Sequence, residues 1–260
     1  MAIQCPAKLN LFLSVGKKDH RGYHPLRSIF QAISLYDELN IERSDTLSFE
    51  CDDPSVPEDN TIVRAARLMM EVADFPPVAV KLIKRIPSEA GLGGGSSDAA
   101  GIIRSAKSLM SVPLPEYEKK AIAKSIGADV SFFLTGGRAR AEGYGDKLTQ
   151  VPSPDPVEWY VIAQPEDRCS TKVAYNRLDE MDFEWRVFPT EDIIYNDFER
   201  VAPCGSLDLI ERLQVHGARD AGLTGSGSAV FGRFTSEADA KRAEKRMTSE
   251  AQFVAVAHSL

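Results

Sequence analysis

Apolar residues occupy every second position from Leu9 to Val15. This alternation predicts a half-buried strand, because successive side chains of a strand point to opposite faces. Lys8 and Asn10 are two positions apart and should therefore share a face. A lysine within such a strand usually points to solvent, so a surface position is the simplest interpretation of Lys8 from the pattern alone.

The same patterns predict the other elements. Strands are expected at residues 28–36, 45–51, 78–86, 159–163, 228–234 and 251–257. Helices are expected after the caps Asn60 and Ser170, and over residues 99–106, 115–127, 206–217 and 236–247. Strands and helices mix without strict alternation, which favours an α+β fold of two lobes. The proline-rich segment 151–159 is the best candidate linker, so we predict an N-terminal lobe over residues 1–152 and a C-terminal lobe over residues 153–260.

Composition narrows the function classes. The chain has 260 residues and a net charge of -7, which argues against a nucleic-acid partner. No apolar run approaches the length of a membrane span, and the N-terminus lacks the pattern of a signal peptide. The four cysteines show no metal-ligand spacing and suggest free thiols in a reducing compartment. We therefore expect a cytoplasmic protein without membrane or nucleic-acid partners, as a monomer or weak homodimer.

A dense glycine cluster lies between a predicted strand and a predicted helix, in the segment IPSEAGLGGGSSDAAGII from Ile86 to Ile103. Such a loop presents backbone N–H groups beside the positive end of a helix and favours a phosphate ligand. It matches neither the P-loop nor the dinucleotide fingerprint. Ser96 and Ser97 can donate hydroxyl hydrogen bonds or cap the helix. A side chain at Gly93 or Gly94 should block the phosphate, and the alternative is a flexible loop followed by a helix cap.

A second glycine cluster, LTGSGSAVFG, runs from Leu223 to Gly232. By itself it is as consistent with a tight turn as with a functional loop.

Several segments resemble a known family. PSEAGLGGGSSDAA resembles the P-x-x-x-G-L-G-x-x-S-S motif of the GHMP kinases, named for galactokinase, homoserine kinase, mevalonate kinase and phosphomevalonate kinase. The segments PAKLNLFLSVGKKDHRGYH, GADVSFFLTGG, CSTKVAY, NDFE and GARDAGLTGSGSAVFG are similar, in this order, to the branch that phosphorylates a cytidine-diphosphate-linked methylerythritol in non-mevalonate isoprenoid synthesis. The chain departs from the family at Ser88-Glu89 and at LTGSG, and residues 179–195 match nothing in it.

The resemblance implies a two-lobed GHMP kinase fold, with an N-terminal mixed α/β lobe and a C-terminal lobe of antiparallel sheet plus helices. It also implies ATP and Mg²⁺ as cofactors. The implied ATP-binding residues are Pro87, Glu89, Ala90, Gly91, Leu92, Gly93, Gly94, Gly95, Ser96 and Ser97. Mg²⁺ should be held mainly by the ATP phosphates, so no protein ligand is assigned, although Ser97 is a candidate and Asp98 could be only an acid of the first helical turn.

The family's catalytic carboxylate falls on Asp129, which would accept the proton of the substrate hydroxyl or mainly orient that hydroxyl. By pattern alone, Asp129 could instead cap the helix VSFFL. The resemblance places Lys8 beside Asp129, where a cation keeps the carboxylate ionised and offsets charge on the transferring phosphoryl group. Asn10, on the face of Lys8, is a candidate contact for a substrate hydroxyl.

Three residues are the implied contacts of the cytidylated substrate. Tyr23 and Tyr175 match the aromatic positions that grip the cytosine ring from its two faces, and His24 would supply hydrogen bonds to the base edge. Each tyrosine, taken alone, is more simply interpreted as an ordinary half-buried residue.

Three alternatives stay open. Another GHMP enzyme, such as a mevalonate or homoserine kinase, shares the glycine loop but gives no reason for the segment around Tyr23 and His24. A non-catalytic nucleotide-binding module would lack the catalytic lysine or carboxylate. A serine hydrolase using Ser96 or Ser97 would need a histidine base, and no histidine lies in a recognisable triad context.

Overall fold

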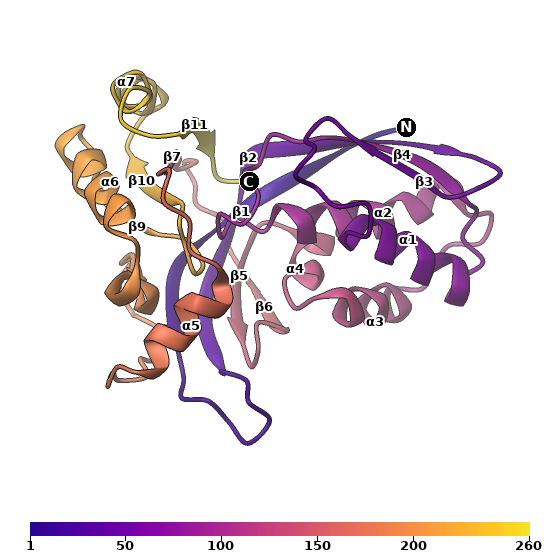
Figure 1. The fold of residues 1–260 in the computed structure, drawn as a ribbon, viewed down its shortest axis with the longest axis horizontal. Helices are drawn as coiled ribbons and strands as arrows, with labels where there is room; N and C mark the ends of the chain where they lie inside the picture. Colours follow the sequence, from indigo (N-terminus) through magenta and orange to yellow (C-terminus); the bar gives the residue numbers. More distant parts are fainter. The chain divides into compact units, whose positions relative to one another are not determined.

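The computed structural model describes all residues from Met1 to Leu260. It contains strands and helices in a mixed order, without strict alternation (Figure 1). The strands are β1 (Ala2–Val15), β2 (Leu26–Arg43), β3 (Ser48–Cys51), β4 (Val78–Ile83), β5 (Arg138–Glu142), β6 (Lys147–Val151), β7 (Trp159–Gln164), β8 (Tyr195–Asn196), β9 (Asp220–Leu223), β10 (Val230–Phe234) and β11 (Phe253–His258). The helices are α1 (Thr61–Val72), α2 (Gly94–Leu109), α3 (Glu116–Ile126), α4 (Val130–Thr135), α5 (Thr171–Asp179), the 3₁₀ helix η1 (Asp197–Val201), α6 (Cys204–Val215) and α7 (Glu237–Met247). None of these helices combines the length and apolar character needed to cross a membrane.

The strands form two sheets. The larger is mixed and has the strand order β3-β4-β2-β1-β8, with β5 pairing with β2 and β6 pairing with β5. In it, β3 runs parallel to β4 and β8 runs parallel to β1, whereas β4 and β5 run antiparallel to β2. The smaller sheet is antiparallel throughout, in the order β11-β7-β10-β9. A mixed sheet and a separate antiparallel sheet confirm the α+β class.

Contacts divide the chain into two compact units. The first comprises residues 1–7, 36–88 and 93–136, and the second comprises residues 8–35, 89–92 and 137–260. Both long strands, β1 and β2, contribute a segment to each unit. This division is not the one expected from the sequence, whose boundary after residue 152 stays a prediction about the lobes.

In the first unit, helices α1 to α4 lie together on one face of the strands β3 and β4 (Figure 1). The apolar stripe of α1 is buried, and the Asn60 side chain caps this helix by accepting from the N–H groups of Ile62 and Val63, as predicted. Helix α2 presents a face of small buried residues, including Ala99 and Gly101, so it packs closely on the sheet.

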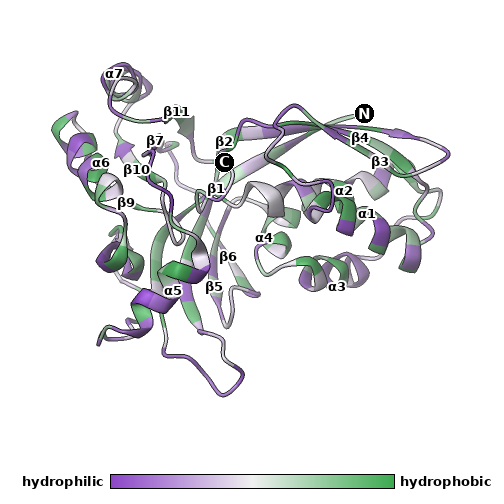
Figure 2. Ribbon diagram, viewed as in Figure 1, coloured by the Kyte–Doolittle hydropathy of each residue, from purple (hydrophilic) through white to green (hydrophobic).

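In the second unit, β7 is one of the two inner strands of the antiparallel sheet and is almost wholly buried. Helices α6 and α7 both pack against it. Ser236 caps the helix predicted over residues 236–247, since its hydroxyl accepts from the N–H of Asp239 and donates to the Asp239 carboxylate. The loop from β1 to β2, residues 16–25, is hydrophilic and lies at the bottom of the view in Figure 2.

The sequence patterns miss several short elements. The predicted helices are all present within a few residues, and β2 extends past the predicted strand to Arg43. Strands β5, β6, β8 and β9 were not expected. Strand β5 contains Arg138, Arg140 and Glu142 and has only two buried residues, so it carries little apolar signal. Residues 152–158, predicted as a linker, connect β6 to β7 without a helix or strand.

Candidate active site

The glycine loop runs from the end of β4 to the start of α2, as the sequence predicts. Gly93 is the residue before the helix and has a left-handed backbone (φ 73°), so α2 begins at Gly94. Ser96 and Ser97 therefore lie inside the first turn and do not cap the helix, contrary to one of their expected roles. Ser97 is fully buried, and its hydroxyl oxygen has no hydrogen-bond partner in the protein.

The apex of this loop touches the second glycine cluster. At Gly91 (φ +80°) a Cβ atom would lie 2.2 Å from the carbonyl oxygen of Thr224, and at Gly225 it would lie 2.9 Å from Cα of Gly91. The N–H of Ala229 also donates to the carbonyl oxygen of Ala90 at 3.2 Å. The cluster at residues 223–232 is therefore more than a tight turn, because its backbone supports the loop.

Lys8 and Asn10 share a face of β1, as predicted. The Lys8 ammonium donates to Oδ1 of Asn10 and lies 4.8 Å from the centroid of the Phe30 ring. Lys8 is only 4% exposed, so the surface position suggested by the strand pattern is wrong. Its backbone N–H donates to the carbonyl oxygen of Leu92 at 2.9 Å, which joins β1 to the glycine loop.

Asn10 connects Lys8 to the second glycine cluster. Besides its bond to Lys8, Oδ1 accepts from the N–H of Gly225 at 3.0 Å, and Nδ2 donates to Oγ of Ser28 at 2.8 Å. The Asn10 N–H donates to Oγ1 of Thr224 at 3.1 Å. The Asn10 amide thus fixes the position of the Lys8 ammonium, and a contact from Asn10 to a substrate hydroxyl stays a prediction.

The segment NDFE supports the second glycine cluster from another side. Nδ2 of Asn196 donates to the carbonyl oxygens of Leu223 and Gly225, each at 2.8 Å. The Glu199 carboxylate accepts from the N–H of Leu223 at 2.9 Å, and burial raises the pKa of Glu199. Sequence reasoning used this segment only as a landmark, since its contacts are with residues about 25 positions away in the chain.

Asp129 lies between α3 and α4, at the position that precedes the first residue of α4. Its side chain makes no capping hydrogen bond to that helix. The capping alternative therefore does not account for this carboxylate. Asp129 belongs to the first unit and Lys8 to the second, and their pairing stays a prediction.

His24 and Tyr175 lie together. The centroids of their rings are 4.9 Å apart, and Tyr175 also packs edge-on against Phe198 at 4.8 Å. Nδ1 of His24 lies 2.9 Å from the carbonyl oxygen of Gly16, so this nitrogen carries the proton and donates. Nε2 lies 3.3 Å from Oδ1 of Asp179 without a hydrogen bond of good geometry. Asp179 was not anticipated from the sequence.

Tyr23 has a different environment. It is 65% exposed and contacts the ring of Tyr144 edge-on at 5.8 Å. The Tyr144 hydroxyl donates to Asp19 at 2.5 Å, which lowers the pKa of Asp19. The backbone N–H of Tyr23 donates to the same carboxylate at 3.1 Å, so Asp19 holds the turn that carries Tyr23. Tyr144 and Asp19 lie outside the predicted site.

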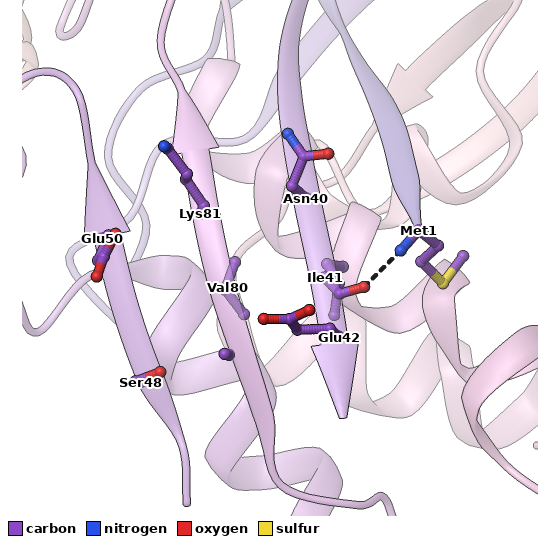
Figure 3. Close-up of a pocket in the computed structure, with 9 residues that line it drawn as sticks. Met1, Asn40, Ile41, Glu42, Ser48, Glu50, Val80 and Lys81 are labelled. Carbon is purple, nitrogen blue, oxygen red and sulfur yellow. Dashed lines mark hydrogen bonds between the residues drawn. The ribbon is translucent and has the colours of Figure 1, made fainter. Parts of the chain in front are cut away.

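A separate cavity of about 330 Å³ opens over β2, β3 and β4 in the first unit (Figure 3). It is lined by residues such as Asn40, Glu42, Glu50 and Lys81, with the side chains of Glu42 and Lys81 extending from adjacent strands. None of the predicted site residues lines this cavity.

Comparison with known proteins identifies two matching family regions. The GHMP kinases N terminal domain matches residues 60–137, and the GHMP kinases C terminal region matches residues 206–252. The chain is 36% identical over 262 residues to a 4-diphosphocytidyl-2-C-methyl-D-erythritol kinase of Acetivibrio thermocellus, with 92% of each chain covered. It is 34% identical to the kinase of that name from Geobacter sulfurreducens, with 100% of this chain and 99% of the relative covered.

Two solved structures have a fold similar to that of this chain. A 4-(cytidine 5'-diphospho)-2C-methyl-D-erythritol kinase superposes with a TM-score of 0.87 at 32% identity, covering 100% of this chain and 99% of the other. A homoserine kinase from Cytophaga hutchinsonii superposes with a TM-score of 0.73 at 18% identity, covering 100% and 94%. The second likeness shows the fold alone.

Proposed function

The chain belongs to the GHMP kinases, in the branch of the 4-diphosphocytidyl-2-C-methyl-D-erythritol kinases, and on this premise we propose the reaction that it catalyses. It transfers the γ-phosphoryl group of ATP to the 2-hydroxyl of 4-(cytidine 5'-diphospho)-2-C-methyl-D-erythritol. The products are ADP and the 2-phosphate, which belongs to the non-mevalonate route to isoprenoid precursors.

The geometry of the glycine loop carries this proposal. The left-handed backbone at Gly91 and Gly93 leads into the N-terminus of a helix of 16 residues. The N-terminal end of this helix, with the N–H groups of Gly94 and Gly95, favours an anion, and ATP supplies the phosphates. A flexible linker would not be held by backbone contacts at its apex, as this loop is through Ala90 and Leu92.

Phosphoryl transfer demands positioning and charge neutralisation more than covalent chemistry. Asp129 orients the 2-hydroxyl and accepts its proton as the oxygen bonds to the γ-phosphorus and ADP leaves. Lys8 supplies positive charge for the transferring group, and its ammonium is pre-oriented by Asn10 and Phe30. These roles of Asp129 and Lys8 rest on the family segments in which they occur.

Mg²⁺ accompanies ATP in this proposal, and oxygen ligands suit it. The hydroxyl of Ser97 is buried without a partner in the first turn of α2, so it fits a ligand position beside the phosphates. When bound, the ion neutralises charge on the phosphate oxygens.

The cytidine part explains the environment of His24. Because Nδ1 of His24 donates to Gly16, Nε2 is the ring nitrogen left to bond the edge of the cytosine base. Tyr175 flanks this ring, and Tyr23 presents an exposed aromatic face from the β1–β2 loop. Stacking accepts every base, so selectivity comes from the base edge.

The test compares acceptors under one set of conditions, with ATP, Mg²⁺ and purified protein. The candidates are the cytidylated methylerythritol, methylerythritol 4-phosphate without the nucleotide, mevalonate and homoserine. We expect kcat/KM for the cytidylated compound to exceed each of the others by at least about 10³-fold, because a buried polar site rejects acceptors that leave it unpaired. Comparable turnover of mevalonate or homoserine would contradict the proposal.

A further inference from the structure

A buried charged cluster lies at the entry of the glycine loop. Asp37 of β2 is fully buried, and its Oδ1 accepts from the N–H groups of Arg85 and Ile86, at 2.6 and 2.7 Å. Its Oδ2 accepts from the Lys84 ammonium at 2.5 Å. One carboxylate therefore binds the last residues before the loop and also a cation.

Lys84 also binds the backbone just before the glycine loop. Its side chain is 8% exposed, and its ammonium also donates to the carbonyl oxygen of Ile86 at 2.7 Å. Asp37 and Lys84 together bind both the N–H and the carbonyl group of Ile86. Ile86 directly precedes Pro87, so the direction in which the chain enters the loop is fixed by these two side chains.

The same two side chains lie against the first residue of α2. A Cβ atom at Gly94 would be 2.9 Å from the Lys84 ammonium and 3.2 Å from Oδ2 of Asp37. A side chain at position 94 would therefore displace the Lys84 ammonium or the Asp37 carboxylate, a reason for glycine that the sequence did not suggest. The cluster contacts the chain on both sides of residues 87–93.

Asp98, one turn further along α2, adds a second carboxyl group. It is 1% exposed, and one of its oxygens has no hydrogen-bond partner. Burial, the Asp37 carboxylate and a hydrogen bond between the two groups raise the pKa of Asp98 well above its ordinary value. The raised pKa favours the protonated form of Asp98, in which Asp37 alone balances the ammonium of Lys84. This avoids an unpaired buried charge, which would be strongly destabilising.

We propose that Asp37 and Lys84 are positioning residues of the phosphate loop, which hold Ile86 and Gly94 so that residues 87–93 are shaped for ATP before ATP binds. The inference rests on the proposed function of the loop. Neither side chain need touch the nucleotide, because both act through the backbone at the two ends of the loop. Pre-organised binding groups avoid the ordering cost that a mobile loop pays on binding.

Lys84→Met tests the proposal, with Lys81→Met, on the preceding strand β4, as the matched control. Lys81 is exposed and extends over the separate cavity (Figure 3). For Lys84→Met we expect KM for ATP and the calorimetric dissociation constant of ATP to rise roughly 10- to 100-fold, since small displacements of binding groups have effects of this size. KM for the cytidylated acceptor should stay within about twofold, as should both ATP constants of Lys81→Met.

A purely structural role would lower the melting temperature while leaving both KM values of the folded protein unchanged, and that result would overturn the proposal. Because Lys84→Met leaves Asp37 without its cation, the double variant Asp37→Asn with Lys84→Met provides a neutral version. It should fold and show the same loss of ATP affinity. Normal ATP affinity in the folded double variant would also overturn the proposal.

Amide hydrogen exchange supplies a readout on the unaltered protein. The amides of Arg85 and Ile86 should be protected without ATP and change little when ATP is added. Strong new protection at these amides on adding ATP would show that the ligand orders the loop, contrary to the proposal. Calorimetry and exchange need no acceptor. If the unaltered protein binds ATP but does not phosphorylate the cytidylated compound, the proposed function fails while this inference is still tested.

Discussion

The entry and the apex of the glycine loop are held by different chemistry. At the entry, Asp37 and Lys84 form a buried ion pair whose partners also bind the backbone of Ile86. At the apex, Gly91 lies against the backbone of Thr224, and the N–H of Lys8 donates to Leu92. The first support depends on charge and the second on close approach of neutral backbone groups.

This difference indicates which perturbations act on each end. A buried ion pair is sensitive to the protonation of neighbouring groups such as Asp98, and it is costly to break by removing one partner. A backbone contact has no titratable group, but it tolerates no additional atom. The two ends of the loop should therefore respond to different substitutions and to different conditions.

The largest effect should come from a residue that belongs to neither end. Asp129→Asn should lower kcat by at least ~10² and leave ATP binding near normal, because the variant keeps the shape of the side chain but removes the base. Steady-state kinetics and ATP calorimetry measure the two quantities. Turnover close to that of the unaltered protein would exclude Asp129 from the chemical step.

The apex is tested by Gly91→Ala, with Gly217→Ala as its control. Both glycines have a positive φ, but a Cβ atom at Gly217 meets nothing within 4 Å, whereas at Gly91 it would lie 2.2 Å from Thr224. Gly217→Ala should lower the free energy of unfolding by about 1 kcal/mol, the cost of the left-handed backbone. Gly91→Ala should cost at least about 2 kcal/mol more and raise KM for ATP.

Urea unfolding measures the stability of both variants, and steady-state kinetics measures their KM for ATP. Equal losses of stability, with unchanged ATP kinetics, would mean that the close approach to Thr224 has no role in shaping the loop. Gly94→Val, which the sequence suggests as a test of the loop, is less specific, because its side chain would meet Lys84 and Asp37.

How much of the site could be predicted from the sequence depends on whether each feature rests on local or on distant contacts. The position of the glycine loop between a strand and a helix, the Asn60 cap and the shared face of Lys8 and Asn10 are local features, and all were predicted. The burial of Lys8 was not, because it depends on Phe30 and on the turn at Gly225. The pair Asp37–Lys84 joins residues 47 positions apart, and no periodic pattern encodes such a contact.

The residues predicted to contact the cytidylated substrate show a similar limit of prediction from sequence. The helix predicted after the Ser170 cap is present as α5, and it contains Tyr175. The neighbours of the predicted aromatic residues, Tyr144 and Asp179, come from distant segments and were missed.

Variants of Tyr23 and Tyr175 should separate effects on substrate binding from effects on folding. Tyr23→Ala and Tyr175→Ala should each weaken the binding of the cytidylated substrate by roughly 5- to 150-fold, where each tenfold corresponds to about 1.4 kcal/mol. The affinity for ATP should stay almost unchanged. Tyr23 is exposed, so its variant should unfold like the unaltered protein. Tyr175 packs between His24 and Phe198, so its variant should also lose about 1–3 kcal/mol of stability.

Inhibition by cytidine diphosphate compounds and thermal unfolding separate these effects. Equal losses of affinity for ATP and for the cytidylated substrate would show that the tyrosines only maintain the fold.

The smallest effect concerns the charge at the loop entry. Because the pKa of Asp98 is raised in the folded state, the folded protein binds the proton more tightly than the unfolded chain does. This contribution to stability is fully present below the ordinary aspartate pKa and is lost as the pH rises toward the folded-state value. Asp98→Asn cannot titrate at this position, so its stability relative to the unaltered protein should increase as the pH rises above the ordinary aspartate pKa. A difference independent of pH in urea unfolding would argue against the shared proton.

The most direct test of the assigned activity identifies the product of one complete turnover. The protein is incubated with ATP, Mg²⁺ and cytidylated methylerythritol, and the mixture is followed by phosphorus NMR. We predict ADP together with a new phosphomonoester on the 2-hydroxyl of the methylerythritol, in equal amounts, with the cytidine diphosphate group intact. Hydrolysis of ATP without a new phosphomonoester, or phosphorylation at another hydroxyl, would contradict the account.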